Sequence, residues 1–196
     1  MSNFNFSLHN YKMCPLSFDL KFPNVSVKFC RKMQKIAFEW FDIAPFRWYH
    51  IKQIRSILIE EEILKDFSVN ITKSLKPVAY MKDSDGIYIS LGALFFKSSM
   101  ATFKVLCHEL AHIWLSQQSF YFDLKRLNKE FKTKYSDSEK VYLSSPIELY
   151  AMVVSVELMK MIRASLTKDF EIKRINKFID LECAKISELI EFIKTL

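Results

Sequence analysis

The chain has 196 residues, half of them hydrophobic and 18 of them phenylalanine, so it can bury a sizeable core in one domain, or in one domain with an extension. Only two glycines and five prolines argue against a loop-rich fold, and no internal repeat is present. The net charge of +7 is spread over many segments and no nucleic-acid-binding motif is present, so there is no strong nucleic-acid signal and we expect a solvated basic surface. Weak attraction to nucleic acid or to acidic proteins is the alternative.

The cysteines and the apolar stretches indicate a compartment. No two cysteines form a CxxC or another close pair, which predicts free thiols in a reducing, cytoplasmic compartment; they are Cys14, Cys30, Cys107 and Cys183. The first residues lack a basic stretch followed by an apolar run, so no secretory signal is expected. The most apolar later stretch, 147–162, contains three charged residues, so no membrane span is expected.

Two helices and a small sheet are predicted in the first half of the chain. Residues 1–26 read as irregular, and apolar residues at helical spacing predict helices over about 27–43 and 49–66. Short alternating runs then predict two or three strands between about residue 69 and residue 89. Asp85-Gly86 is typical of a hairpin turn between two of them.

The next predicted helix, over about 98–118, contains the most informative motif of the chain. His108, Glu109 and His112 form an HExxH sequence. Two histidines four residues apart lie on one face of a helix and can bind one metal ion, while the glutamate can reach a water on that ion. The neighbouring residues are mostly apolar, and burying two histidines and a glutamate without partners is costly, so a metal ion is the expected partner.

The remaining elements are helical. A charged helix is predicted at about 121–135, an apolar helix at about 146–163 and an amphipathic helix at about 168–195. The whole order predicts an α+β fold in which helices dominate and a small, mostly antiparallel sheet precedes the HExxH helix. It is typical of a zincin-like domain at 67–196, on which an N-terminal helical extension at 1–66 packs.

A catalytic zinc usually takes a third protein ligand. No histidine follows His112 and no cysteine has a suitable spacing, so we expect an acidic ligand. Glu148 is the best candidate because it begins an apolar helix in which Ala151 lets a second helix approach closely. Ser145-Pro-Ile-Glu148 also matches a helix-capping box, which would need no metal. Other carboxylates also stay open as the third ligand: Glu157, Glu139 and Asp137.

These residues resemble the ImmA/IrrE-type metallopeptidases. His108-Glu-Leu-Ala-His112 is similar to that family's active helix, and Glu148-x-x-Ala151 falls on its metal-ligand glutamate and its alanine. This chain differs in having Ala111 for the usual glycine and Met152 for the asparagine. The resemblance implies a cytoplasmic zinc endopeptidase, often tied to mobile elements or stress, that cleaves or controls a repressor.

The predicted activity is therefore zinc-dependent hydrolysis of a protein or peptide. Zn²⁺ would be held by His108, His112 and Glu148, and Glu109 would act as general base. The strand at 86–91 would bind an extended substrate by β-addition. A donor to the oxyanion is also required, and three tyrosines are candidates: Tyr150, Tyr142 and Tyr121. The alternative is a non-catalytic binding module of zincin fold that docks a partner protein.

Overall fold

The computed structural model describes residues 28, 31–32, 48–74, 76, 79–82, 86–91, 99–135, 138–164, 166 and 169–196. The helix predicted at 27–43 therefore falls almost wholly outside the described residues, as do Cys14 and Cys30. Within the described part, Cys107 and Cys183 are free thiols. No helix in these ranges combines the length and the apolar character that crossing a membrane requires.

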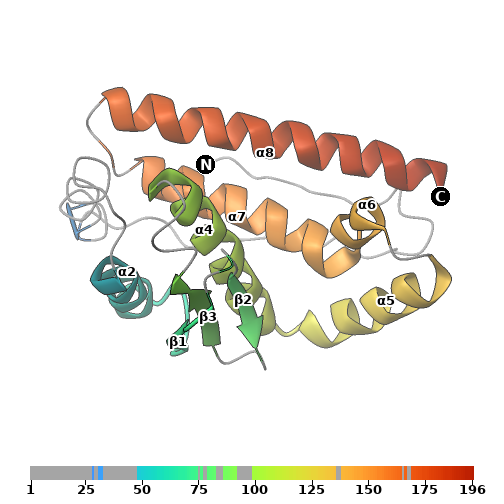
Figure 1. Cartoon of the computed structure of the whole chain (residues 1–196), viewed down its shortest axis with the longest axis horizontal. Helices are drawn as coiled ribbons and strands as arrows, with labels where there is room; N and C mark the ends of the chain where they lie inside the picture. Colours follow the sequence, from blue (N-terminus) through green and yellow to red (C-terminus); the bar gives the residue numbers. More distant parts are fainter. Residues whose placement is uncertain are drawn as a thin grey trace.

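The fold is dominated by helices, with one three-stranded sheet at the edge (Figure 1). The helices are α2 (Trp48–Glu60), α4 (Ser99–Ser116), α5 (Tyr121–Lys134), α6 (Glu139–Leu143), α7 (Pro146–Ala164) and α8 (Asp169–Thr195). The strands are β1 (Ser68–Thr72), β2 (Ala79–Lys82) and β3 (Gly86–Ser90). This arrangement confirms the predicted α+β class with helices dominant.

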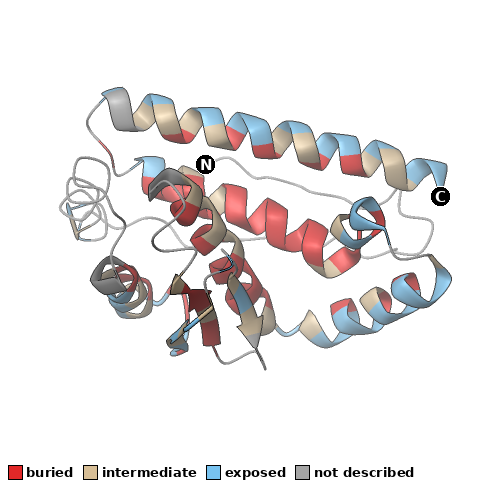
Figure 2. Cartoon of the chain, in the orientation of Figure 1, coloured by how far each residue is buried: buried red, intermediate tan, exposed pale blue. Residues whose placement is uncertain are grey.

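The core is built on the two most apolar helices, α4 and α7, which pack against each other. α8 covers α7 on one side, and the sheet covers α4 on the other (Figure 1). Figure 2 shows α7 buried along most of its length, whereas α8 buries one face and exposes the other. Ala151 is fully buried in α7, as expected for a small residue where two helices approach.

α2 belongs to the same core as the later elements. Ile51, Ile54 and Leu58 on α2 are almost fully buried in the cluster that also contains α4 and α7. The helix ends at Glu60, six residues before the predicted end, because the chain turns sharply there. Glu62 adopts a left-handed conformation with φ of 56°, and the Ile63 N–H donates to the carbonyl of Leu58 at 2.9 Å, which closes a Schellman motif.

The sheet is mixed, so the prediction of a mostly antiparallel sheet was wrong. β3 lies between β1 and β2, pairs in parallel with β1 and pairs antiparallel with β2. The predicted hairpin is present, since Lys82 pairs with Gly86 across residues 83–85. The two parallel strands approach closely at Gly86: a Cβ atom there would lie 2.1 Å from the Ser68 hydroxyl oxygen, so the Ser68 side chain would have to move.

The central place of β3 also corrects the substrate-binding prediction. Because both edges of β3 are paired, the segment 86–91 offers no free edge for β-addition. The outer strands of the described sheet are β1 and β2, and of these β2 contacts the HExxH helix more extensively.

Candidate metal centre

α4 supplies two histidines that face one another. The Nε2 atoms of His108 and His112 lie 3.2 Å apart, and the two rings meet edge to face with centroids separated by 4.7 Å. This is the geometry expected of residues four apart on one helix face. The His108 side chain keeps 26% of its surface exposed, whereas that of His112 keeps 9%, so the pair opens to solvent on the His108 side.

Glu148 reaches the same point from the first turn of α7. Its Oε2 atom lies 3.3 Å from Nε2 of His108 and 3.5 Å from Nε2 of His112. A tetrahedral zinc ion with bonds of about 2.0–2.1 Å holds its ligand atoms about 3.3–3.4 Å apart. Within the described residues, these three side chains form the single group that could hold a metal ion. Their donor atoms and their spacing fit a tetrahedral divalent ion.

The capping box at the start of α7 is not formed. The Ser145 hydroxyl is buried and makes no hydrogen bond with any described group. The free N–H of Ile147 instead donates to the side-chain oxygen of Asn128 on α5 at 3.2 Å. Asn128 therefore takes over the capping role, and the Glu148 carboxylate is directed at the two histidines.

Tyr142 holds the second oxygen of the same carboxylate. The Tyr142 hydroxyl, on α6, donates to Oε1 of Glu148 at 2.8 Å. Oε2 is thereby left for the histidines. Burial of the phenol and the adjacent Glu148 charge raise the pKa of Tyr142, so this hydroxyl stays protonated and remains a donor.

The other two tyrosines predicted as oxyanion donors differ from Tyr142 in their surroundings. Tyr150 is fully buried in α7, whereas Tyr121 lies at the start of α5 beneath the ammonium group of Lys125.

Glu109 is buried beside the three candidate ligands but is not one of them. Its carboxylate accepts a hydrogen bond from the backbone N–H of Met81 on β2, which fixes it against the sheet. Burial raises the pKa of Glu109, and the two neighbouring histidines partly offset this effect. A buried carboxylate with a raised pKa is a better proton acceptor than an ordinary exposed one.

The electrostatics of the ligand group are those of a cation site. Burial alone would raise the pKa of Glu148, but hydrogen bonds from both histidines hold it well below its usual range. Burial alone would lower the pKa of His108, but its hydrogen bond to Glu148 and the charge of Glu109 raise it. In the absence of a metal, the ionised carboxylate thus favours a proton on the His108 imidazole, at the position where a metal cation would place its positive charge.

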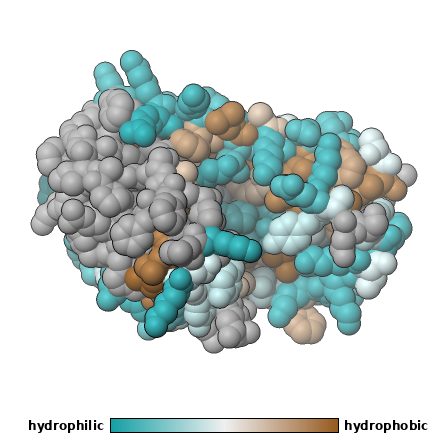
Figure 3. All heavy atoms as spheres, viewed as in Figure 1, coloured by the Kyte–Doolittle hydropathy of each residue, from teal (hydrophilic) through white to brown (hydrophobic). Residues whose placement is uncertain are grey.

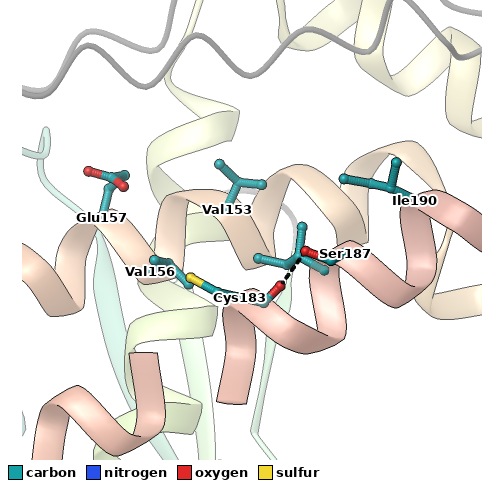
Figure 4. Close-up of a pocket in the computed structure, with 7 residues that line it drawn as sticks. Val153, Val156, Glu157, Cys183, Ser187 and Ile190 are labelled. Carbon is teal, nitrogen blue, oxygen red and sulfur yellow. Dashed lines mark hydrogen bonds between the residues drawn. The ribbon is translucent and has the colours of Figure 1, made fainter. Parts of the chain in front are cut away.

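Neither of the two alternative third ligands that the structure describes, Glu157 and Glu139, belongs to the group formed with the histidines. Glu157 forms an ion pair with Lys160 at 2.7 Å. It also lines a pocket of about 190 Å³ between α7 and α8, together with Val153 and Cys183 (Figure 4). Glu139 is exposed at the start of α6, and Asp137 lies outside the described residues.

Four residues at the site were not found by the sequence analysis in these roles. Asn128 and Tyr142 act on Glu148 as described above, and Met81 binds Glu109. The fourth is Glu182, a buried carboxylate on α8 that pairs with Lys104, one turn before His108 on α4. All four are distant in sequence from the motif or contribute only a backbone group, so no local pattern indicates them.

Comparisons with protein-family models, with curated proteins and with solved structures found no match.

Proposed function

We propose that this protein is a zinc-dependent endopeptidase, with His108, His112 and Glu148 as the metal ligands. The observation that supports this most strongly is the convergence of one oxygen and two nitrogen atoms, 3.2–3.5 Å apart, with a buried fourth side chain, Glu109, alongside. Three protein ligands with one open position are typical of catalytic zinc sites, whereas structural sites usually have four protein ligands.

The ion would supply Lewis acidity, which lowers the pKa of a bound water to about 7 and polarises the scissile carbonyl. Glu109 is then the general base: it accepts a proton from the attacking water and passes it to the leaving amine. The Met81 N–H orients this carboxylate, and its burial raises its affinity for the proton. Of the candidate oxyanion donors, Tyr142 is favoured because it is half exposed and its hydroxyl binds the ligand group through Oε1 of Glu148.

The substrate of such an enzyme would lie along β2. This strand is at the edge of the described sheet, and Met81 on it binds the proposed base. An extended peptide that pairs with an edge strand gains main-chain hydrogen bonds regardless of its sequence. A protein or peptide substrate is therefore the class that the site fits best. A repressor as the physiological substrate stays a proposal that rests on the family resemblance alone.

The decisive experiment compares zinc content with hydrolysis. Protein purified without chelator should carry about one zinc per chain by elemental analysis, and it should cleave fluorescein-labelled casein. Glu109→Gln should keep the zinc and lose at least about a hundredfold in cleavage rate, because an amide cannot accept the proton. His108→Ala and His112→Ala should lose both zinc and activity.

Two outcomes would contradict the proposal. Full zinc content in both histidine variants would place the metal elsewhere. Cleavage by Glu109→Gln at the wild-type rate would exclude the general-base mechanism. Zinc bound at His108 and His112 without any hydrolysis would instead favour the non-catalytic docking module.

A further inference from the structure

The outer face of α5 has an unusual distribution of charge. α5 carries five basic and two acidic side chains, a net charge of +3, whereas α8 carries five basic and six acidic ones. α4 and α7 each balance to zero. The net positive charge of the described helices is thus concentrated on α5, where Figure 3 shows hydrophilic side chains gathered at the lower right.

Three lysines and a phenylalanine of α5 lie on one face of the helix. Phe122, Lys125, Lys129 and Lys132 follow one another at spacings of three, four and three residues, which places them in a single stripe opposite the buried residues of α5. All four are exposed, and Phe122 is 81% exposed. We name this set the α5 stripe. Its length, from the first to the last Cα atom, is about 15 Å at the helical rise of 1.5 Å per residue.

No described carboxylate neutralises the lysines of the stripe. No carboxylate of the described residues lies within ion-pair distance of Lys125, Lys129 or Lys132. The acids of α5 lie on an adjacent face, where Asp123 pairs with Arg126. Like charges three or four residues apart weaken a helix. The stripe therefore carries a cost in stability that a partner with negative charge would remove.

Aromatic rings fix two of the three ammonium groups. Nζ of Lys125 lies 5.7 Å from the ring centre of Tyr121, and Nζ of Lys132 lies 5.3 Å from that of Tyr142. A cation held over a ring is more ordered than one on a free side chain, so less entropy is lost when it binds an anion.

The stripe ends at the proposed catalytic centre. The Tyr142 ring beneath Lys132 is the same ring whose hydroxyl donates to Glu148 at 2.8 Å. One tyrosine side chain thus separates the last lysine of the stripe from the metal-ligand carboxylate. A chain segment lying along the stripe would lead directly to the site.

We infer that the α5 stripe is a docking surface for an acidic segment, bearing an apolar residue at one end, of the protein substrate. This inference rests on the proposed function, because it assigns the stripe to the substrate of that site. Charge complementarity identifies the occupant: carboxylates match the three unpaired lysines, and an apolar side chain matches the exposed ring of Phe122. Three cations are too few for tight binding of nucleic acid, which typically uses about 6–10 phosphate contacts.

The test measures binding rather than cleavage. The full-length chain carrying Glu109→Gln is titrated into a fluorescein-labelled peptide that contains a run of glutamates beside a leucine, and anisotropy is followed at low salt. The stripe variant carries Lys125→Gln, Lys129→Gln and Lys132→Gln together. Exposed ion pairs each contribute about a twofold to fivefold change in affinity, so the stripe variant should bind about tenfold more weakly.

One control tests whether the position of the removed charge matters, and a second tests whether the peptide binds through its own charge. Lys173→Gln, Lys177→Gln and Lys185→Gln together remove the same charge from α8 and should change the affinity by less than twofold. A peptide with glutamine in place of glutamate should bind weakly to every variant. Added salt should weaken the binding of the acidic peptide, because the stripe is exposed.

Several results would overturn the inference. An equal affinity of the stripe variant and its parent would do so, as would an equal loss in the α8 control. Tighter, stripe-dependent binding of a single-stranded oligonucleotide than of the acidic peptide would assign the surface to nucleic acid instead. Zinc content is measured on the same samples. Stripe-dependent peptide binding by a chain that holds no zinc would support the docking surface while refuting the proposed peptidase.

Discussion

Glu148 shows how one side chain can match two sequence patterns whose geometries exclude each other. A glutamate in the first turn of a helix can reach back to the cap residue or forward to a neighbouring element. Here the cap role is filled from outside the helix, by Asn128. The carboxylate stays close to the positive end of the α7 dipole, which favours its ionised form, and both of its oxygens are bound by α4 and α6.

This arrangement makes Glu148→Gln a sharp test of the ligand assignment. Glutamine keeps the size of the side chain and can still bond Tyr142, but it is a poor zinc ligand. We expect the variant to fold, because Asn128 still caps α7 and Tyr142 can still donate to the side chain, and to lose most of its zinc and all its activity. Competition with a zinc indicator measures the affinity. Zinc retained at wild-type affinity would remove Glu148 from the ligand set.

Tyr142→Phe separates support of the ligand from contact with the substrate. Removing the hydroxyl frees Oε1 of Glu148, and losing such a supporting hydrogen bond typically costs about 10–100-fold in metal affinity. We expect zinc affinity to fall by about tenfold, with casein hydrolysis restored at saturating zinc. Hydrolysis that stays low at saturating zinc would instead make Tyr142 the oxyanion donor.

At the scale of elements, the sequence pattern located the long helices well. The starts and ends predicted for α4, α5, α7 and α8 lie within two residues of those observed, because apolar residues at helical spacing mark the buried faces. α6 was not predicted. It has five residues, too few for a period to show, although Ser138 caps it by accepting a hydrogen bond from the Val141 N–H. The sheet was predicted to be mostly antiparallel but is mixed, since alternation within a strand does not say which strand is its neighbour or in which direction that neighbour runs.

The end of α2 was missed because its sequence lacks the usual stop signal. A Schellman motif normally places glycine at the left-handed position, but Glu62 occupies it here with φ of 56°. An L-residue with a side chain pays about 1–2 kcal/mol for this conformation. Glycine at residue 62 would have marked the boundary clearly in the sequence.

The same feature gives a stability prediction. Glu62→Gly should raise the free energy of unfolding by about 0.5–1 kcal/mol, because glycine adopts positive φ without strain, although the unfolded chain gains some entropy. Urea denaturation measures the change. Ser56→Gly, at an exposed position inside the helix, is the control and should destabilise by about 0.5 kcal/mol. If Glu62→Gly is also destabilising, this helix end is not strained as described.

At the scale of the whole molecule, the candidate site collects groups from six of the nine described elements. α4 and α7 give the three ligand candidates, α5 and α6 act on Glu148, β2 binds Glu109, and α8 pairs with α4 through Glu182 and Lys104. His108, Glu109 and His112 were predictable because they are contiguous. Glu148 required elimination, and the supporting groups depend on tertiary contacts that one sequence does not encode locally.

Because the ligands come from two packed helices, binding of a metal ion should stabilise the entire fold. A ligand that binds only the folded state at a hundred times its dissociation constant adds about 2.7 kcal/mol. In a chain of this size each kcal/mol raises the melting temperature by about 2–4 °C, so saturating zinc should raise it by about 5–10 °C relative to chelator-treated protein. Thermal unfolding monitored by circular dichroism measures the shift. Glu148→Gln and His112→Ala should each lose most of it. An equal zinc-induced shift in both variants would show that the ion binds outside the α4–α7 junction.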